Sequence, residues 1–532
     1  MSSRKGNCLC GPSLGETIPN CSFAEFAIPL MRSHPKDNII QVDALTGYSE
    51  TSRQFLEKSL KVCEGLRKLD FGQNDIILLV ARNSSDVYSA VLGVLWLGGT
   101  VMPVDFSWKS LEMQGIFKKV KPTGVICEEQ YLGNITPALN NLGINAKVIL
   151  LAAKDKVKKP HISFDELLDV AVDVDNYKPE PVESPSTKPA ILILTSGTTG
   201  TSKAVEFTHR HLIFQLKHMN RIGRDEGFDN CLVTSHFYWI TCTMSLIISL
   251  GSGHKRIYMS DVNYTNILNA IEKYKPQSMI ISPASLSLIG KINGIEKYDF
   301  SCFKVIFLGG SQLTRTLLEN IQSVWKTLPL VNLYGCSEVT GPASRTEINT
   351  KLLSIGKPLY DYKIKIIDTV TGEDLGPHET GEICISSPGV MLRYANDEEI
   401  TKAVIDGEWY HTGDLGYYDE TGYVYFVGRI KEMIKNPGNF QITPTEIEGV
   451  IEKIPGVSEA GVVGVFPEAD KFELIAVVVK HKGSNITEDE IKKVVKESLA
   501  DYKQLSRVKF VSTLPRSNVG KMLRRDLLEM VG

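Results

Sequence analysis

One stretch of the chain, TSGTTGTSK, has the composition of a phosphate-binding loop. It spans residues 195–203 and follows the apolar run 190–194. Gly197 and Gly200 allow backbone amides to form an anion-binding nest, and Lys203 adds a mobile positive charge. The hydroxyl donors are Thr195, Ser196, Thr198, Thr199 and Thr201. A Ser/Thr/Gly surface linker is the alternative. The loop is not a Walker motif, because two residues separate its second glycine from the lysine.

Three further motifs carry a charged group that a nucleotide site could use. They are YGCSE with Glu338, WYHTGD with Asp414 and PRSNVGK with Lys521. Carboxylates bind Mg²⁺ or accept hydroxyl groups, and an ammonium group stabilises a negatively charged transition state. Taken alone, each has an ordinary explanation. Glu338 and Asp414 stand in turn-like sequences, and Lys521 lies beside a basic tail that contains Arg524 and Arg525.

Alternating apolar and amphipathic segments predict the elements that position these motifs. Residues 76–81 predict a buried strand, and Ser85 or Asp86 is expected to cap the helix that follows. Gly98 and Gly99 are expected to end that helix. Further strands are predicted at 101–102, 124–127, 147–151, 279–282 and 305–308. The repetition of strand and helix predicts α/β layers with mostly parallel sheets.

Residues 352–427 differ from this layered part because they are rich in short alternating strands. Examples are 362–367 and 382–386. The pattern predicts a more antiparallel, β-rich subdomain. A Pro/Ser/Glu-rich stretch at 178–188, just before the phosphate loop, predicts an exposed connector.

A second change of pattern falls at Gly428 and Arg429. The elements expected beyond it are a helix at 444–452, strands at 460–466 and 474–480, and a helix opened by a capping box of Thr487 and Glu490. The remaining length, about a hundred residues, suffices for a small α+β domain. We therefore expect a large N-terminal domain at 1–427 and a small, mobile C-terminal domain at 428–532.

The length and composition are those of a globular, enzyme-sized protein with more than one domain. The 532 residues carry a formal net charge of −3, and 42% of them are hydrophobic. This length exceeds one hydrophobic core, and the near-neutral charge offers no field for nucleic acid. The sequence shows no run of roughly 20 apolar residues, no secretory signal and no peroxisomal S-K-L tripeptide. We expect a cytoplasmic monomer with free cysteines, no nucleic-acid partner and no stable membrane insertion.

Read in order, seven strings make the chain resemble the adenylate-forming superfamily. This group contains acyl- and aryl-CoA ligases, peptide-synthetase adenylation domains and insect luciferases. The strings are TSGTTGTSK (195–203), LGGS (308–311), YGCSE (334–338), GEICISSPGVMLRY (381–394), WYHTGD (409–414), GRIKEMIK (428–435) and PRSNVGK (515–521). One such string can arise by chance, whereas seven in the family's order are specific. The resemblance covers nearly the whole chain.

The resemblance implies a nucleotide-binding role for the matched residues. The loop at 195–203 would cover the β- and γ-phosphates of ATP, and Glu338 would hold Mg²⁺ against the phosphate oxygens. Asp414 would accept both ribose hydroxyls, with Arg429 beside it. The residues implied to border adenine, the acyl group or the phosphates are Gly309, Gly310, Ser311, Tyr334, Gly335 and Ser337. Tyr334 would stack on the base.

Three residues are implied in the chemistry itself. Lys521 would reach from the small domain to the α-phosphate and the substrate carboxylate, where it would stabilise the transition state. After a large swing of the small domain, Lys435 would serve a second half-reaction. His236 would lie next to the acyl site.

Several positions depart from the family's usual pattern. The segment 435–444 is one residue longer than usual and carries Pro437, which puts the second half-reaction face in doubt. His236 lacks the flanking Pro and Gly, and the bulky residues 237–239 either line an aromatic pocket or pack in the core. Gln215 stands about where beetle luciferases tend to carry Arg. A beetle-type luciferin pocket is therefore not expected, while a differently built insect luciferase stays open.

The sequence thus predicts an ATP- and Mg²⁺-dependent enzyme. It would activate a fatty or aromatic carboxylic acid as its adenylate, release pyrophosphate and pass the acyl group to CoA. A luciferase that oxidises a luciferyl-adenylate with O₂ and emits light is the alternative. A third hypothesis is a non-catalytic nucleotide or acyl binder. The intact Lys521 argues against it, because a binder needs no transition-state lysine.

Overall fold

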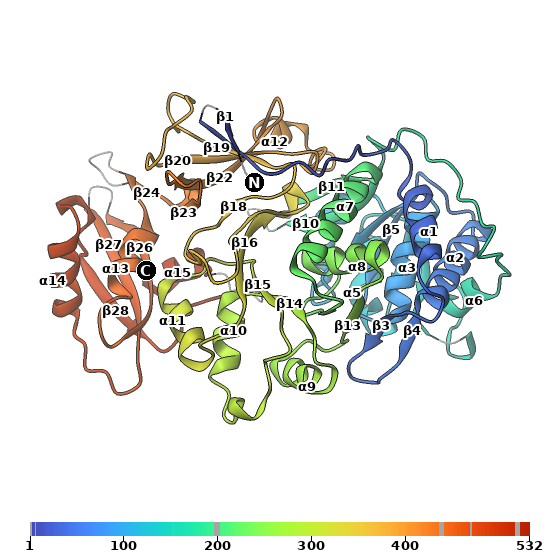
Figure 1. Ribbon diagram of the computed structural model, residues 1–532, viewed down its shortest axis with the longest axis horizontal. Coiled ribbons are helices and arrows are strands. Elements are labelled where there is room, and N and C mark those ends of the chain that lie inside the picture. The colour runs from blue at the N-terminus through green and yellow to red at the C-terminus, as the bar shows by residue number, and fades with distance from the viewer. Residues whose placement is uncertain are drawn as a thin grey trace.

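The computed structural model describes residues 3–5, 7–152, 154–195, 203–435, 441–468, 471–516 and 522–531. It is a mixed α/β protein with a large N-terminal domain and a small C-terminal domain. Figure 1 shows the small domain in orange to red at one end of the molecule. The fold class expected from the sequence is confirmed. Among the described residues, no helix has both the length and the apolar character needed to span a bilayer.

The first layered unit contains a seven-stranded sheet in the order β11-β10-β6-β5-β7-β8-β9. Neighbouring strands run parallel except β10 and β11, which form an antiparallel hairpin. The strands are β5 (Ile76–Val80), β6 (Thr100–Pro103), β7 (Gly124–Cys127), β8 (Lys147–Leu150), β9 (Ile162–Ser163), β10 (Pro189–Thr195) and β11 (Lys203–Thr208). The accompanying helices are α2 (Ser52–Lys68), α3 (Ser85–Trp96), α4 (Ser110–Val120), α5 (Leu132–Asn141) and α6 (Phe164–Leu168). Helices α2 and α3 pack on each other, as do α4 and α5.

The second sheet has nine strands in the order β18-β17-β16-β15-β14-β12-β13-β3-β4. From β16 to β3 the neighbours run parallel. The strands are β3 (Ile39–Asp43), β4 (Ser49–Thr51), β12 (Asn230–Leu232), β13 (Lys255–Tyr258), β14 (Ser278–Ile281), β15 (Val305–Leu308), β16 (Leu330–Cys336), β17 (Gly341–Arg345) and β18 (Lys357–Pro358). The helices are α1 (Phe23–Ser33), α7 (His209–Glu226), α8 (Ile240–Ser252), α9 (Tyr264–Tyr274), α10 (Pro283–Gly290) and α11 (Arg315–Val324). Because β15 and β16 are parallel, the residues that follow them meet at one edge of the sheet.

The third sheet is antiparallel and contains the β-rich segment expected from the sequence. Its order is β1-β2-β19-β20-β22-β21, and β23 pairs with β22. The strands are β1 (Ser3–Lys5), β2 (Cys8–Cys10), β19 (Lys363–Ile367), β20 (Gly381–Ser386), β21 (Ile405–Asp406), β22 (Trp409–Tyr418) and β23 (Val424–Arg429), with helix α12 (Glu398–Lys402) beside them. The N-terminal strand β2 pairs with β19, more than 350 residues away, which the sequence pattern did not predict.

The C-terminal elements form a small α+β unit with an apolar core of its own. Ile447, Val462 and Ile491 are fully buried in it. The strands are β24 (Ile434–Lys435), β25 (Gln441–Ile442), β26 (Val457–Glu468), β27 (Lys471–Lys480) and β28 (Arg507–Val511), and the helices are α13 (Pro444–Ile451), α14 (Glu488–Ser498) and α15 (Arg524–Val531). The capping box of Thr487 and Glu490 opens α14 as expected. Strand β23 continues through Gly428 to Arg429, so the division at 427 and 428 stays a prediction.

One local expectation was wrong. Ser85 and Asp86 do not cap α3, because Ser84 does so from an extended backbone, with its Oγ accepting the Val87 N–H at 3.2 Å. Ser85 and Asp86 are instead the first helical residues. The helix ends before Gly98, whose φ of +80° suits glycine.

Candidate active site

The predicted phosphate loop connects β10 and β11. Thr195, the last residue of β10, pairs directly with Lys203, the first residue of β11. The antiparallel register therefore fixes both ends of the loop. The residues between these ends, with the predicted ligands Ser196, Gly197, Thr198, Thr199 and Gly200, lie outside the described residues.

Lys203 sits against an aromatic ring next to a carboxylate. Its Nζ lies 4.6 Å from the ring centroid of Tyr394. The Tyr394 hydroxyl donates a 2.8 Å hydrogen bond to Glu338 Oε1. Burial lowers the pKa of Lys203, and the nearby Lys431 ammonium group adds to that effect. Burial and the adjacent Glu338 charge raise the pKa of Tyr394, which keeps its hydroxyl protonated as a donor.

Glu338 lies in a short 3₁₀ turn, Ser337–Val339, that directly follows β16. Its backbone carbonyl accepts the Met391 N–H at 2.7 Å, which ties the turn to the segment before Tyr394. That segment also pairs with β11, since Val205 and Tyr394 form a bridge. The structure thus brings together the base of the phosphate hairpin and Glu338, with Tyr394 between them.

Asp414 is the most enclosed of the predicted ligands that the structure describes, with 5% of its surface exposed. Its Oδ2 accepts the Tyr334 hydroxyl at 2.8 Å, and its Oδ1 lies 3.1 Å from Arg429 Nε. Asp414 and Arg429 also pair across β22 and β23. Burial and the neighbouring carboxylate raise the pKa of Tyr334 well above its usual range. Two strands and the end of β16 therefore converge on one carboxylate.

The glycine-containing segment after β15 leaves an open edge near these groups. A Cβ built at Gly309 would make only ordinary contact with Leu333, and Gly310 has a φ of +84°. Ser311 Oγ is buried and, within the described part of the chain, has no hydrogen-bond partner. A buried hydroxyl without a partner suits a polar ligand that binds at this edge of the sheet and supplies the missing hydrogen bond.

Gly335 lacks a side chain for a different reason from the one the motif suggests. A Cβ at this position would lie 1.9 Å from the Gly341 carbonyl oxygen on the paired strand β17. Backbone packing alone therefore requires glycine here. A direct role of Gly335 toward the nucleotide stays a prediction.

His236 belongs to an aromatic cluster in the loop between β12 and α8. Its ring lies edge-on to Phe106, with centroids 5.0 Å apart, and stacks on Tyr238 at 5.8 Å. Phe106 also stacks on Tyr131. Burial lowers the pKa of His236. Of the bulky residues 237–239, Phe237 is a core residue with 1% exposure, whereas the other two are half-buried.

The two predicted catalytic lysines are not placed in the same detail. Lys435 ends the short strand β24, and its side chain is outside the described set, as is the whole of Lys521. Arg524, which follows Lys521 closely in the sequence, is held by two carboxylates. It donates from Nε to Glu432 at 2.8 Å and from Nη1 to Glu448 at 2.6 Å. Arg524 therefore has a structural role between two carboxylates, while the role of Lys521 stays a prediction.

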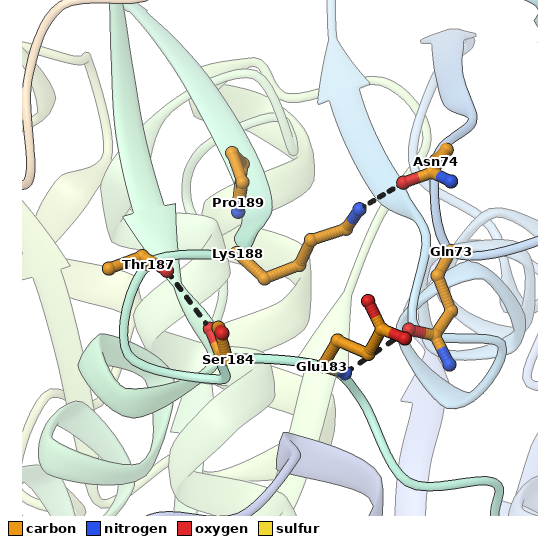
Figure 2. Close-up of a pocket in the computed structure, with 7 residues that line it drawn as sticks. All are labelled: Gln73, Asn74, Glu183, Ser184, Thr187, Lys188 and Pro189. Atoms are coloured by element: carbon orange, nitrogen blue, oxygen red, sulfur yellow. Dashed lines mark hydrogen bonds between the residues drawn. The ribbon is translucent and has the colours of Figure 1, made fainter.

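A surface hollow beside the 178–188 connector is not the site. Figure 2 shows hydrogen bonds among the residues that line it. The Lys188 side chain donates to Asn74 at 2.5 Å, and the Glu183 backbone N–H donates to the Gln73 side chain at 3.3 Å. None of the residues that line this hollow comes from the seven sequence strings. The connector is thus pinned to the β5 side of the first sheet.

Tyr394 is the site residue that motif reasoning missed. It is the last residue of the GEICISSPGVMLRY string, yet nothing in the letters distinguishes a ligand-holding tyrosine from a packed one. The bond from its hydroxyl to Glu338 became evident only from the three-dimensional arrangement.

Comparison with known proteins agrees with this geometry. The family model described as AMP-binding enzyme matches residues 31–395, and the AMP-binding enzyme C-terminal domain matches residues 446–521. The chain is 30% identical to peroxisomal OPC-8:0-CoA ligase 1 of Arabidopsis thaliana, over 96% of this chain and 94% of that protein. It is 28% identical to luciferin 4-monooxygenase of Photinus pyralis, over 92% of this chain and 90% of that protein.

Solved structures show the same architecture. ATP-bound MatB from Rhodopseudomonas palustris superposes with a TM-score of 0.84 at 21% identity, covering 96% of this chain and 99% of that one. A luciferase-like enzyme from the nonluminescent mealworm Zophobas morio gives a TM-score of 0.72 at 26% identity, covering 80% and 99%. With its seven motifs, its two matched domains and this fold, the chain belongs to the AMP-binding enzyme family, within the adenylate-forming superfamily.

Proposed function

We propose that the protein activates a carboxylic acid with ATP to give an acyl-adenylate and pyrophosphate, and then transfers the acyl group to CoA. The observation that carries this proposal is the placing of two charged centres around the end of β16, which carries Tyr334 and is followed by Glu338. One is Asp414 with Tyr334 and Arg429, and the other is Glu338 with Tyr394 and Lys203. Together they provide the groups that a ribose and a triphosphate require.

At the ribose end, Asp414 would accept both hydroxyl groups. A carboxylate has several acceptor positions, so it can keep Arg429 while binding sugar hydroxyls. Its burial excludes competing water, which strengthens each hydrogen bond. The buried Ser311 hydroxyl, after β15, is proposed to take a polar group of the bound acyl-adenylate or its adenine.

At the phosphate end, Lys203 and the hairpin amides would face the β- and γ-phosphates. Lys203 now contacts a neutral ring, and among the described residues it has no ion pair that moving its ammonium group to a phosphate would break. Glu338 fits a bound Mg²⁺, because a carboxylate oxygen is a hard ligand and Tyr394 holds the group in place. Mg²⁺ would neutralise phosphate charge there.

The rest of the proposal concerns the acyl group of the substrate and the two lysines that would act in the two half-reactions. His236, neutral and set among aromatic rings, would border the acyl group. Lys521 would stabilise the transition state at the α-phosphate, and Lys435 would serve transfer to CoA after the small domain swings. The boundary at 428 and this motion are part of the proposal. A cytoplasmic, monomeric protein is its simplest setting.

A luciferase-like oxidation of the adenylate is the second candidate. It is supported by the 28% identity to luciferin 4-monooxygenases, which is nearly as high as the identity to the CoA ligases. Gln215 argues against a beetle-type luciferin pocket. Its Nε2 donates to the Thr340 carbonyl at 2.7 Å, so it acts as a neutral brace in the core beside β17.

Product analysis separates the two candidates. The purified protein would be given Mg·ATP, a panel of fatty and aromatic acids, and either CoA or O₂ with luciferin. Formation of AMP and an acyl-CoA supports the ligase. Light emission without acyl-CoA formation would replace it with the luciferase.

A further inference from the structure

A second cluster of ligand-type side chains, which does not include the Glu338 carboxylate, lies on the antiparallel sheet. Within the described ranges, Glu382, Cys384 and His411 form the group whose potential ligand atoms all lie within 4.8 Å of one another. His411 Nδ1 is 3.0 Å from Glu382 Oε2 and 3.7 Å from Cys384 Sγ. The proposed reaction uses none of these three side chains.

The sheet register explains why the three side chains meet. Cys384 on β20 lies directly opposite His411 on β22, so both point to the same face. Glu382 lies two residues before Cys384 and therefore shares that face. The register then shifts: between His411 and Leu415, β22 has three residues where β20 has only Ile383, so β22 forms a bulge there. This bulge is the turn that carries Asp414.

The separations suit a tetrahedral metal ion. With metal–sulfur distances of about 2.3 Å and metal–nitrogen or metal–oxygen distances of about 2.0 Å, ligand atoms lie about 3.3 to 3.5 Å apart. The two measured separations fall on either side of this range. Shifts of a few tenths of an ångström would therefore bring the His411–Glu382 and His411–Cys384 separations to these values. The Glu382 oxygen and the Cys384 Sγ lie within 4.8 Å of each other, and a water molecule could supply a fourth ligand.

The residues around the cluster also favour metal binding. The other oxygen of Glu382 accepts the Gly413 N–H at 2.9 Å, which fixes the carboxylate as outer bonds do in metal sites. Cys384 is fully buried, whereas the His411 side chain is 28% exposed, which leaves an entry path. Lys365 approaches this face, but its ammonium group is paired with Asp374 at 3.1 Å.

We propose that Glu382, Cys384 and His411 bind one divalent transition-metal ion, with Zn²⁺ favoured by the mixed sulfur, nitrogen and oxygen donors. A thiolate and an imidazole disfavour Mg²⁺ and Ca²⁺, so this site is distinct from a magnesium site at Glu338. The bound ion braces the bulge that positions Asp414. Binding of the metal does not depend on the proposed reaction.

Cobalt provides the direct test, because a Co²⁺–thiolate bond has an intense charge-transfer absorption. The reduced full-length protein would be titrated with Co²⁺ and then with Zn²⁺. We expect one Co²⁺ per chain, a thiolate band and its loss on displacement by Zn²⁺. Cys384→Ser should remove the band and weaken Zn²⁺ binding by more than about 100-fold, the upper end of what loss of an outer-sphere partner costs.

The matched control uses the two thiols on the nearby strand β2. Cys8 and Cys10 have Sγ atoms 3.9 Å apart and lie on a strand of the same sheet, so they are competing soft ligands. The double variant Cys8→Ser/Cys10→Ser should keep the Co²⁺ band. Zn²⁺ should also raise the melting temperature of the wild type and of this control, but not that of Cys384→Ser.

Three results would overturn the proposal. They are the absence of a thiolate band in the wild type, a band that survives Cys384→Ser, and a band that disappears in the Cys8/Cys10 variant. If Cys384→Ser does not fold, His411→Asn replaces it and should weaken Zn²⁺ binding at least about tenfold. Unchanged affinity in that variant would mean that the three side chains are only a hydrogen-bonded brace.

Discussion

The two ends of the proposed nucleotide site are built differently. At the ribose end, Asp414 is buried and already held by the Tyr334 hydroxyl and the Arg429 guanidinium group. At the phosphate end, Lys203 lies over a neutral ring, and Glu338 is held by the hydroxyl of that ring. The first arrangement resists rearrangement, whereas the second leaves a cation that can move.

This difference indicates a division of labour. In this proposal, a preformed carboxylate in a low-dielectric setting would bind the part of ATP that does not change during the reaction. At the phosphate end, the charge and bonding of the phosphates would change during the reaction. A lysine held only by a weak cation–π contact could move with them, which is an advantage there. Mutations at the ribose end should therefore impair ATP affinity, and those at the phosphate end should alter the dependence on magnesium.

Replacement of Asp414 should have the largest effect. Asp414→Ala removes the proposed acceptor of two ribose hydroxyls. Each such charge-assisted hydrogen bond is worth about 1.5 to 3 kcal/mol, so kcat/KM for ATP should fall about 1,000-fold. Asp419→Asn is the control, because Asp419 is also buried beside β22 but bonds to Lys351. The control should lose stability without a change in the KM for ATP. Equal KM values for both variants would remove Asp414 from the nucleotide site.

Glu338→Gln should rank next. The amide keeps the shape and one acceptor but loses the charge that would hold Mg²⁺, so kcat should fall about 100-fold. Because Asp414 is untouched, the dissociation constant for ATP without metal should stay within about twofold. Steady-state kinetics across a magnesium series, with metal-free ATP binding measured by calorimetry, would show this split. A loss confined to metal-free ATP binding would contradict the assignment.

Tyr394→Phe changes the site residue that the motifs did not predict, and its effect on activity should be smaller than that of Glu338→Gln. It removes only the hydroxyl that holds Glu338, so about tenfold more Mg²⁺ should be needed for half-maximal rate. Saturating Mg²⁺ should restore most of kcat. Tyr362→Phe is the matched control, since its buried hydroxyl donates to the Val339 carbonyl next to Glu338. The same magnesium shift in both variants would reveal a general packing effect.

The smallest expected effect is a pH dependence of stability that is caused by His236, the residue proposed to border the acyl group. Burial depresses the pKa of His236, so the unfolded chain takes up this proton first as pH falls through about 6.5. The contribution of His236 to stability is therefore present above that pH and declines below it. Between pH 7.5 and 6, the melting temperature of the wild type should fall slightly more steeply with decreasing pH than that of His236→Gln. A shallower slope in the wild type would mean that His236 is charged in the fold.

Local pattern predicted the layered elements well. Strands β7 and β15 have the predicted bounds, because a short apolar run between turn residues leaves few alternatives. The cap of α3 was misplaced by one residue, since three consecutive polar residues offer similar capping groups. The pairing of β2 with β19 could not be predicted, because long-range register leaves no trace in a three-residue strand.

The same limits apply to the site. The motifs predicted Glu338 and Asp414 as neighbours of a nucleotide, and the structure gives both a defined hydrogen-bonded setting. They did not predict that the Tyr334 hydroxyl would bond to Asp414, because that bond links residues 80 positions apart. Gly335 shows the opposite case: its motif suggests a ligand contact, but packing against β17 alone requires glycine.

Acid-dependent exchange of labelled pyrophosphate into ATP, without CoA and O₂, tests the central claim most directly. The protein with Mg·ATP and a suitable carboxylic acid should catalyse exchange. Lys521→Ala should bind ATP normally and lose at least about 100-fold of the exchange rate. If a broad panel of fatty and aromatic acids elicits no exchange from folded, ATP-binding protein, the proposed adenylation is wrong.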